Sequence, residues 1–194
     1  IKRGHDMHRE FKVQSGVRAA FSKVPKMFSF SEDTAILGSD FYIMEKVDGI
    51  ILNYKEAKQR NLSSVEYTTV ANSWLETMTQ LHAIDYKEVG LESLGKPEGY
   101  VSRQVANWGK QFLKVKTTAY PEAALVMEWM ELHQPKEYQH CLIHNDYKYD
   151  NIVFKDDSWK EVAAVLDWEM ATLGDPLMDL GTSLGYWTVA TDHE

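Results

Sequence analysis

The sequence predicts an α+β fold with two lobes, because both helical periodicity and short apolar strand-like runs occur along its 194 residues. The pair Asp48-Gly49 interrupts the apolar pattern and is the one candidate boundary between the lobes. We therefore expect a smaller lobe at 1–47, with a partial sheet and a helix, and a larger, mainly helical lobe at 48–194.

The first lobe is expected to hold one helix and two strands. Four apolar residues recur near helical spacing and predict a helix over 5–20: Met7, Phe11, Val17 and Ala20. The runs "KMFSF" and "FYIMEKV" predict strands, with a turn at Ser31-Glu32-Asp33 after the first.

Three helices are expected in the middle of the chain. Ser63 precedes Glu66 at the spacing of a capping box, and the apolar stripe that follows ends near His82. That stripe consists of Val70, Trp74, Met78 and Leu81. Further helices are predicted over 100–115 and over 121–132, the second with proline in its first turn.

Short strands return after residue 140. The brief apolar runs "CLI", "NIVF" and "VAAVLD" predict strands, with a tight turn at Asp156-Asp157-Ser158 between the last two. Asp175 and Pro176 have the pattern of an N-cap followed by proline at the first helical position, so a helix is expected through "LMDLGTSLGYW".

Composition narrows the classes of protein. No run of about 18 apolar residues is present, so no membrane span is expected. A net charge of −8 disfavours nucleic acid as a partner. The single cysteine, Cys141, cannot form an internal disulfide, and we expect it to be buried. An intracellular protein is expected, cytoplasmic by default, with the mitochondrion and the peroxisome left open.

The stretch "HNDYKYDN" joins two predicted strands and carries His144, Asp146 and Asn151, and Asp167 ends the next apolar run. Strand ends fix the backbone while polar side chains project from one edge. The oxygen-bearing side chains of Asp146, Asn151 and Asp167 are therefore expected to converge. Mg²⁺ prefers oxygen ligands and keeps several waters, so Asn151 and Asp167 suffice as ligands if substrate phosphates complete the shell.

Asp146 is then the candidate base that accepts the proton of an attacking hydroxyl as a phosphoryl group moves. The spacing H-x-D-x-x-x-x-N matches the catalytic-loop signature of kinases. Lys148 is expected to offset charge on the transferring phosphate, and a solvated loop lysine is its alternative. His144 is expected to orient the loop by hydrogen bonding.

On these residues the chain resembles the aminoglycoside phosphotransferase and choline kinase branch of the protein-kinase-like fold. The resemblance is carried by "LIHNDYKYDNIVF" and "AVLDWEMATLGDPLMDLGTSLGYW". The segments "HREFKV", "EDTAILGSDFYIMEKVDG" and "YVSRQVANWGKQF" are most similar to the kinase-like domain associated with acyl-CoA dehydrogenase family members ten and eleven. The resemblance implies a bilobal fold, ATP and Mg²⁺ as cofactors, and a fused or associated dehydrogenase as a partner.

The resemblance also implies roles for single residues. Asp179 would brace the catalytic loop, with a helix-surface acid as the alternative. Met44 to Val47 would form the hinge between lobes, where backbone groups of Glu45 and Val47 pair with adenine. Glu10 would hold a phosphate-binding lysine. No strand that would carry this lysine precedes Glu10, and no glycine-rich loop does. We therefore expect either a chain that lacks its first strands or a degraded kinase. C-terminal helices are likewise expected to be missing.

The basic residues Arg103, Lys110 and Lys114 share one face of the helix predicted over 100–115. A solvated face is the default interpretation, and the alternative is a patch for the phosphates of a coenzyme A thioester. Trp108, between them, is expected to pack against the protein.

The function predicted is ATP- and Mg²⁺-dependent phosphorylation of a small-molecule hydroxyl, and the resemblance implies a hydroxyacyl-CoA. Three alternatives stay open: a kinase for aminoglycoside or choline-like alcohols, a non-catalytic nucleotide-binding module, and a metal-dependent hydrolase that uses His144 and Asp146.

Overall fold

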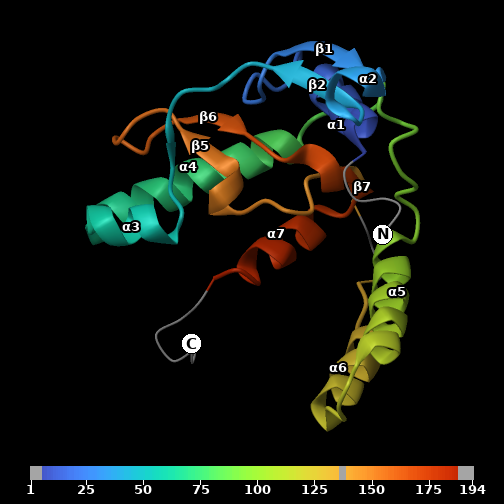
Figure 1. Cartoon of the computed structure of the whole chain (residues 1–194). Coiled ribbons are helices and arrows are strands. Elements are labelled where there is room, and N and C mark those ends of the chain that lie inside the picture. The colour runs from blue at the N-terminus through green and yellow to red at the C-terminus, as the bar shows by residue number, and fades with distance from the viewer. Residues whose placement is uncertain (1–5, 136–138, 188–194) are drawn as a thin grey trace.

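The computed structural model describes residues 6–135 and 139–187 of the chain. Within that part, helices and three small antiparallel sheets alternate, and the α+β class predicted from the sequence is confirmed. Figure 1 shows a thin layer of strands over a helix at the top, a central body, and a helical hairpin that extends downward.

The upper layer contains the first four elements of the chain. These are α1 (Met7–Val17), β1 (Met27–Ser31), α2 (Thr34–Leu37) and β2 (Phe41–Met44). β1 pairs antiparallel with β2, and Ser31 lies opposite Phe41. α1 packs under this pair and buries Val13 and Val17. The helix predicted over 5–20 is therefore shorter, because the chain turns after Val17.

The turn predicted at Ser31-Glu32-Asp33 leads into α2, a helix that was not predicted from the sequence. The Asp33 carboxylate accepts the N–H of Ala35 at 2.9 Å and caps the helix. Gly38, in the left-handed region at φ 84°, ends it after one turn. A helix this short has no measurable periodicity, so only its cap could have indicated it.

The strand predicted over 41–47 is also shorter than expected, since β2 ends at Met44. The chain then descends to β3 (Ile50–Ile51), which pairs antiparallel with β5 (Ile152–Phe154). Gly49 makes this approach possible. A Cβ atom at that position would lie 2.3 Å from the Phe154 carbonyl oxygen, so a larger residue does not fit.

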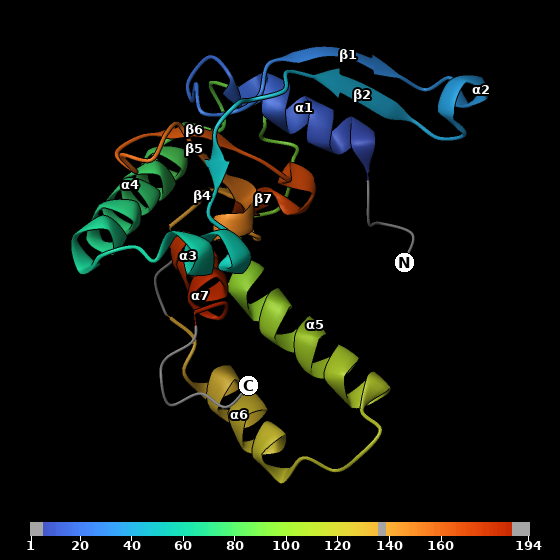
Figure 2. The same cartoon turned by 60° about the vertical axis from the view of Figure 1, so that its left-hand side comes forward.

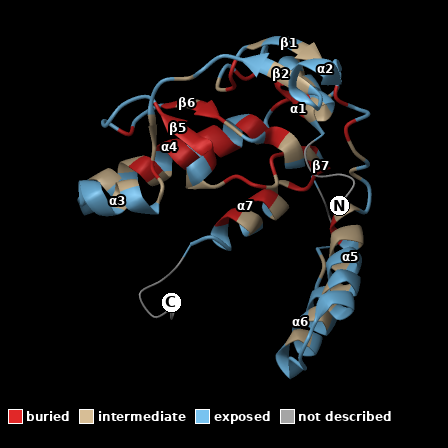
Figure 3. Cartoon of the chain, in the orientation of Figure 1, coloured by how far each residue is buried: buried red, intermediate tan, exposed pale blue. Residues whose placement is uncertain are grey.

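The long helix α4 (Ser64–His82) forms the centre of the core, as the sequence predicts. Ser63 and Glu66 make a complete capping box. The predicted apolar stripe is buried and packs toward the strands: Val70, Trp74, Met78 and Leu81. Figure 3 shows the buried residues concentrated on α4 and the neighbouring strands. The helix before it, α3 (Tyr54–Arg60), was missed.

Two small sheets lie beside α4. In one, β3, β5 and β6 (Val162–Val165) lie in that order, and in the other β4 (Cys141–Ile143) pairs antiparallel with β7 (Thr172–Gly174). The strands expected at "CLI", "NIVF" and "VAAVLD" are thus present, although each is only three or four residues long. Cys141 is a buried free thiol, as predicted.

The helices α5 (Tyr100–Val115) and α6 (Pro121–Leu132) have the predicted bounds and form an antiparallel hairpin. Figures 1 and 2 both show the hairpin projecting from the body. Trp108 is 59% exposed, so the expectation that it packs against the protein was wrong. The two helices contact each other, and the outer face of α5 lies beyond the reach of the core.

No helix in the described part of the chain is both long and apolar enough to cross a membrane.

Candidate active site

The last described helix, α7 (Pro176–Leu184), holds the loop that follows β4. Asp175 caps α7 by accepting the N–H of Leu177 at 2.8 Å, as predicted from the sequence. One turn later Asp179 is fully buried. Its two carboxylate oxygens accept the backbone N–H groups of His144 at 2.8 Å and Asn145 at 2.6 Å. The start of the loop is therefore fixed by a charged acceptor.

His82 completes the surroundings of Asp179. Its Nε2 atom lies 3.0 Å from Asp179 Oδ2, so α4 and α7 meet at this carboxylate. The alternative interpretation of Asp179, an acid on the surface of a helix, does not agree with a fully buried side chain that makes these contacts.

Asn145 is a site residue that sequence reasoning missed. Its backbone has a left-handed φ of 64°, which asparagine tolerates better than most residues. Its Nδ2 atom donates to the Met170 carbonyl and to the Tyr100 hydroxyl, each at 3.0 Å. The loop thereby turns sharply while staying tied to α5. An asparagine two residues after the strand was the only signal in the sequence.

His144 is fully buried and its hydrogen bonds define one tautomer. Nε2 lies 3.0 Å from the Leu166 carbonyl, which can only accept, and Nδ1 lies 3.3 Å from the Asp146 backbone N–H, which can only donate. The ring is therefore neutral, with its proton on Nε2. Burial lowers the pKa of His144, and the nearby Asp179 only partly offsets this.

Asp146 is nearly buried and receives three side-chain donors. Its Oδ2 accepts Lys148 Nζ at 2.7 Å and Asn151 Nδ2 at 3.0 Å, and its Oδ1 accepts the Tyr186 hydroxyl at 2.9 Å. The hydrogen bond to Asp146 raises the pKa of Lys148. A carboxylate held by three donors is well oriented, which suits a proton acceptor.

Asn151 links the carboxylate of Asp146 to the strand β5. Its Nδ2 atom donates to both the main-chain oxygen of Asp146, at 2.9 Å, and Oδ2. Among the described residues these are its side-chain hydrogen bonds, so Oδ1 is left available. The Asn151 carbonyl accepts the N–H of Leu166 at 2.8 Å, which brings the residue beside the end of β6.

Asp167 follows Leu166 directly and so lies at the same end of β5 and β6. Its backbone adopts a left-handed φ of 65°. Partial burial raises the pKa of Asp167, and the negative charges of Glu169 and Asp146 raise it further. The structure thus brings Asp146, Asn151 and Asp167 to one edge, with a local excess of negative charge that a cation would relieve.

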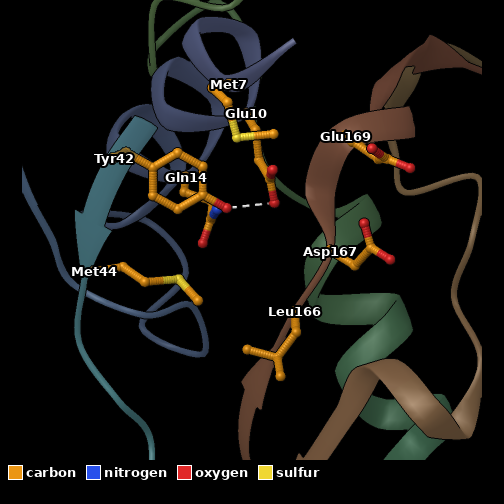
Figure 4. A pocket seen from close by; sticks show the side chains of 8 residues that line it. All are labelled: Met7, Glu10, Gln14, Tyr42, Met44, Leu166, Asp167 and Glu169. Carbon is orange, nitrogen blue, oxygen red and sulfur yellow. Dashed lines mark hydrogen bonds between the residues drawn. The ribbon is translucent and has the colours of Figure 1, made fainter. Parts of the chain in front are cut away.

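A pocket of about 350 Å³ separates this edge from the upper layer. Figure 4 shows α1 and β2 on one side of the pocket and the segment after β6 on the other. The lining residues are Met7, Glu10, Gln14, Tyr42, Met44, Leu166, Asp167 and Glu169. The predicted residues Glu10, Met44 and Asp167 therefore face one cavity.

Glu10 is buried on the wall of this pocket. Its Oε1 atom accepts the Trp168 backbone N–H at 3.1 Å and Gln14 Nε2 at 3.4 Å. Burial raises the pKa of Glu10, while hydrogen bonds from Tyr42 and Trp168 act in the opposite direction. Within the described residues, Glu10 therefore ties α1 to the segment that carries Asp167.

The predicted hinge residues lie just beyond β2. The Glu45 backbone N–H donates to the Lys26 carbonyl at 2.8 Å, so that N–H is engaged within the upper layer. Val47 is half-buried and precedes the descent to β3. Of the three predicted hinge residues, Met44 is the one that lines the pocket.

A second pocket, of about 610 Å³, is bordered by Lys148. It is lined mainly by aromatic and small apolar residues of α3, α4, the catalytic loop and the segment after α7, including Tyr54, Tyr67, Tyr149 and Trp187. Lys148, Asp150 and Tyr186 add its charged and polar groups. This volume falls in the range of small-molecule sites.

The basic residues predicted as a substrate patch lie on α5, apart from both of these pockets. The Arg103 guanidinium donates to the carbonyls of Lys96 and Glu98 and is thus engaged in holding that loop. Lys110 and Lys114 are exposed, and Lys110 borders a separate cavity of about 460 Å³ between α5 and α6.

The residues at this edge fit a magnesium ion that takes only a few of its ligands from the protein. Within 6–135 and 139–187, no three His, Cys, Asp or Glu side chains are grouped to hold a metal. Asn151 Oδ1 and the Asp167 carboxylate offer oxygen atoms at one edge, which would suit an ion whose remaining ligands come from phosphates and water.

Comparison with known proteins extends the match over the whole chain. The model of a family described as "Phosphotransferase enzyme family" matches residues 2–194. The mouse protein "Acyl-CoA dehydrogenase family member 10" is 34% identical over 94% of this chain and 17% of its own length. Human "Acyl-CoA dehydrogenase family member 11" is 36% identical over 93% of this chain and 23% of its own length. The chain thus spans only a small part of these relatives.

Solved structures are similar as well. A Ralstonia eutropha protein described as a candidate aminoglycoside phosphotransferase is 33% identical, with a TM-score of 0.86 over 96% of this chain and 56% of the other. The streptomycin–ATP complex of APH(2")-IIa is 22% identical, with a TM-score of 0.62 over 89% of this chain and 57% of the other. The predicted protein-kinase-like fold and the predicted relationship to the two dehydrogenase family members are both confirmed.

Proposed function

The chain belongs to the phosphotransferase enzyme family, and from that premise we propose that it transfers the γ-phosphoryl group of ATP to a hydroxyl of a small molecule, with Mg²⁺ bound. The domain division at Asp48-Gly49 is part of the proposal, with the nucleotide in the pocket beneath the upper layer and the acceptor in the aromatic pocket.

The observation that carries the proposal is the pairing of Asp146 with Asn151. One amide group holds the carboxylate through Nδ2 and leaves its own Oδ1 for a cation, so a proton acceptor and a metal ligand are fixed together. Catalysis of phosphoryl transfer depends mostly on such positioning and on charge neutralisation.

Each site residue then has a defined task. Asp146 accepts the proton of the acceptor hydroxyl, and Lys148, 2.7 Å from Asp146 Oδ2, is close enough to lend positive charge to the transferring group. Asn151 and Asp167 would hold Mg²⁺, which supplies charge neutralisation for the phosphates when bound. Asp179 and His144 position the loop. Glu10 and Met44 line the nucleotide pocket, and Glu45 and Val47 follow Met44 as the hinge between the lobes.

The lining of the second pocket favours an acceptor with an apolar arm. Aromatic and small apolar side chains dominate it, and Asp150 is the acidic residue among those that line it. A polycationic sugar would require more carboxylates. Together with the acyl-CoA names of the relatives, this supports a hydroxyacyl-CoA as the acceptor. Aminoglycoside and choline-like alcohols are the competing acceptors. The free thiol of Cys141 supports an intracellular site of action.

A screen of alcohols tests the proposal. The full-length protein is incubated with γ-labelled ATP and Mg²⁺ and with hydroxyacyl-CoA thioesters of several chain lengths, choline, or an aminoglycoside. Label on one hydroxyacyl-CoA is the expected result. Label on choline or the aminoglycoside would contradict the acceptor class while leaving the kinase reaction intact.

The variant Asp146→Asn tests the base. Its amide keeps the volume but cannot take a proton, so transfer should fall by about 10³-fold while ATP affinity and folding are preserved. Asp157→Asn, in an exposed turn, is the matched control and should be unaffected. Full activity of Asp146→Asn would refute the role of Asp146.

Two other functions give different results in the same assay. A nucleotide-binding module without catalysis binds ATP yet labels no alcohol and releases no ADP. A metal-dependent hydrolase releases phosphate from a phosphorylated substrate in the absence of ATP.

A further inference from the structure

The hydroxyl of Tyr186 occupies a distinctive place in the site, because it donates to the less crowded oxygen of the candidate base. Asp146 Oδ2 already accepts Lys148 and Asn151, whereas Oδ1 accepts Tyr186 at 2.9 Å. An acceptor alcohol that delivers its proton to Asp146 would approach Oδ1, since that oxygen has the spare capacity. A phenolic O–H group therefore stands where the acceptor O–H group would stand.

The position of Tyr186 is set by the end of α7. Gly185 closes the helix, and the Tyr186 N–H donates to the Ser183 carbonyl at 3.1 Å. The Ser183 hydroxyl in turn donates to the Tyr147 carbonyl in the catalytic loop at 2.6 Å. The backbone that carries Tyr186 is thus anchored on the same loop as Asp146.

The side chain, in contrast, is loosely held. Tyr186 is 55% exposed and borders the aromatic pocket, so turning its ring away costs little buried area. The Tyr186 ring also contacts Lys148, whose Nζ lies 5.3 Å from the ring centroid. The hydrogen bond to Asp146 raises the pKa of Tyr186, so the phenol remains a donor at neutral pH.

We propose that Tyr186 is a placeholder for the acceptor hydroxyl: it covers Asp146 Oδ1 while the acceptor pocket is empty, and an incoming alcohol displaces it. The inference rests on the proposed kinase function and adds a means of suppressing wasteful ATP hydrolysis. In that side reaction water attacks the γ-phosphorus, the bond to the β,γ-bridging oxygen breaks, and Asp146 takes the water proton, which yields ADP and phosphate.

The variant Tyr186→Phe removes only the hydroxyl. It therefore distinguishes a placeholder role, which needs the hydroxyl, from a packing role, which needs only the ring. Without an acceptor, it should hydrolyse ATP about tenfold faster than the wild type, the factor that one hydrogen bond to a charged group contributes. With the acceptor alcohol, KM should fall while kcat changes little. Tyr120→Phe alters a tyrosine that is also 55% exposed but lines neither pocket, and it is the matched control.

The measurement is ADP and phosphate release by full-length protein with Mg·ATP, alongside ATP affinity by calorimetry. Adding Asp146→Asn to Tyr186→Phe should abolish the extra hydrolysis. Unchanged hydrolysis in Tyr186→Phe with normal ATP affinity would overturn the placeholder and leave the kinase function standing. A fall in both hydrolysis and alcohol transfer would overturn it in favour of a residue that positions Asp146. Wild-type protein that does not bind ATP would refute the kinase function itself.

Discussion

The carboxylate of Asp179 accepts the backbone N–H of His144 at 2.8 Å, although 35 residues separate the two in the chain. The adjoining N–H of Asn145 binds the other carboxylate oxygen at 2.6 Å. One buried charge therefore holds two successive peptide units at the start of the loop that carries Asp146, so the precision of the loop depends on a residue in α7.

Replacing Asp179 by asparagine should weaken both the fold and the reaction. The new NH₂ group cannot accept, so one backbone N–H is left facing a donor, and we expect a loss of about 2–3 kcal/mol in the free energy of unfolding. Urea unfolding at pH 7 measures this change. The exposed Asp157→Asn variant should stay within about 0.5 kcal/mol of the wild type. Equal stability of the two variants would contradict the bracing role.

Reversing the charge of Lys110 and Lys114 together tests the basic face of α5. If this face binds the phosphates of a coenzyme A thioester, acyl-CoA affinity should fall roughly tenfold, since each exposed contact contributes up to about 1 kcal/mol. ATP affinity should not change. Calorimetry with each ligand provides the measurement. Reversal of Lys155 and Lys160, exposed in the β5–β6 segment, is the control, and unchanged acyl-CoA affinity in the first variant would remove the patch from consideration.

The neutral buried ring of His144 should make stability depend on pH. Its folded pKa is lowered from the ordinary 6.5, so below that value the unfolded chain binds a proton that the folded chain excludes. Stability is then fully present above about pH 6.5 and is lost as the pH falls below it toward the lowered pKa of the folded state. Denaturant midpoints measured between pH 5 and 8 should show this slope. In His144→Gln, which does not titrate, the slope should be shallower; an identical slope would show that other groups cause it.

The glycine between β2 and β3 should be intolerant of any side chain. In Gly49→Ala the methyl group would lie 2.3 Å from the Phe154 carbonyl oxygen and 2.5 Å from Val153 Cγ1. Backbone must therefore move, at a cost of about 1–3 kcal/mol. Gly181→Ala, where the added atom meets nothing within 4 Å, should be neutral or slightly stabilising. Thermal unfolding of the two variants compares them, and similar melting temperatures would contradict the close approach.

Local signals in the sequence located the long helices correctly. The Ser63–Glu66 capping box and the stripe around Trp74 lie within one segment, so their geometry follows from helical spacing alone. Two of the elements that were missed, β3 and β7, are two and three residues long. They exist because β5 and β4 offer them partners, and such pairing is not visible in a single stretch of sequence.

The same distinction between local and distant contacts applies to the site. Asp146 and Asn151 belong to one short motif, and the structure joins them by a hydrogen bond. Tyr186 is 40 residues from Asp146, so its contact could not be read from spacing. Lys148 was expected to serve the phosphate, and its contact with Asp146 is a pairing that the sequence did not indicate. The engagement of Arg103 with nearby carbonyls likewise depends on the path of a loop.

The distance in sequence between His144 and Asp179 also orders events on the ribosome. When His144 is translated, the carboxylate that will fix the loop is still 35 residues away from being translated. Until then the two N–H groups bind water, and the nascent loop has no single conformation. The loop therefore acquires its fixed geometry only after α7 has been synthesised and has packed against β4.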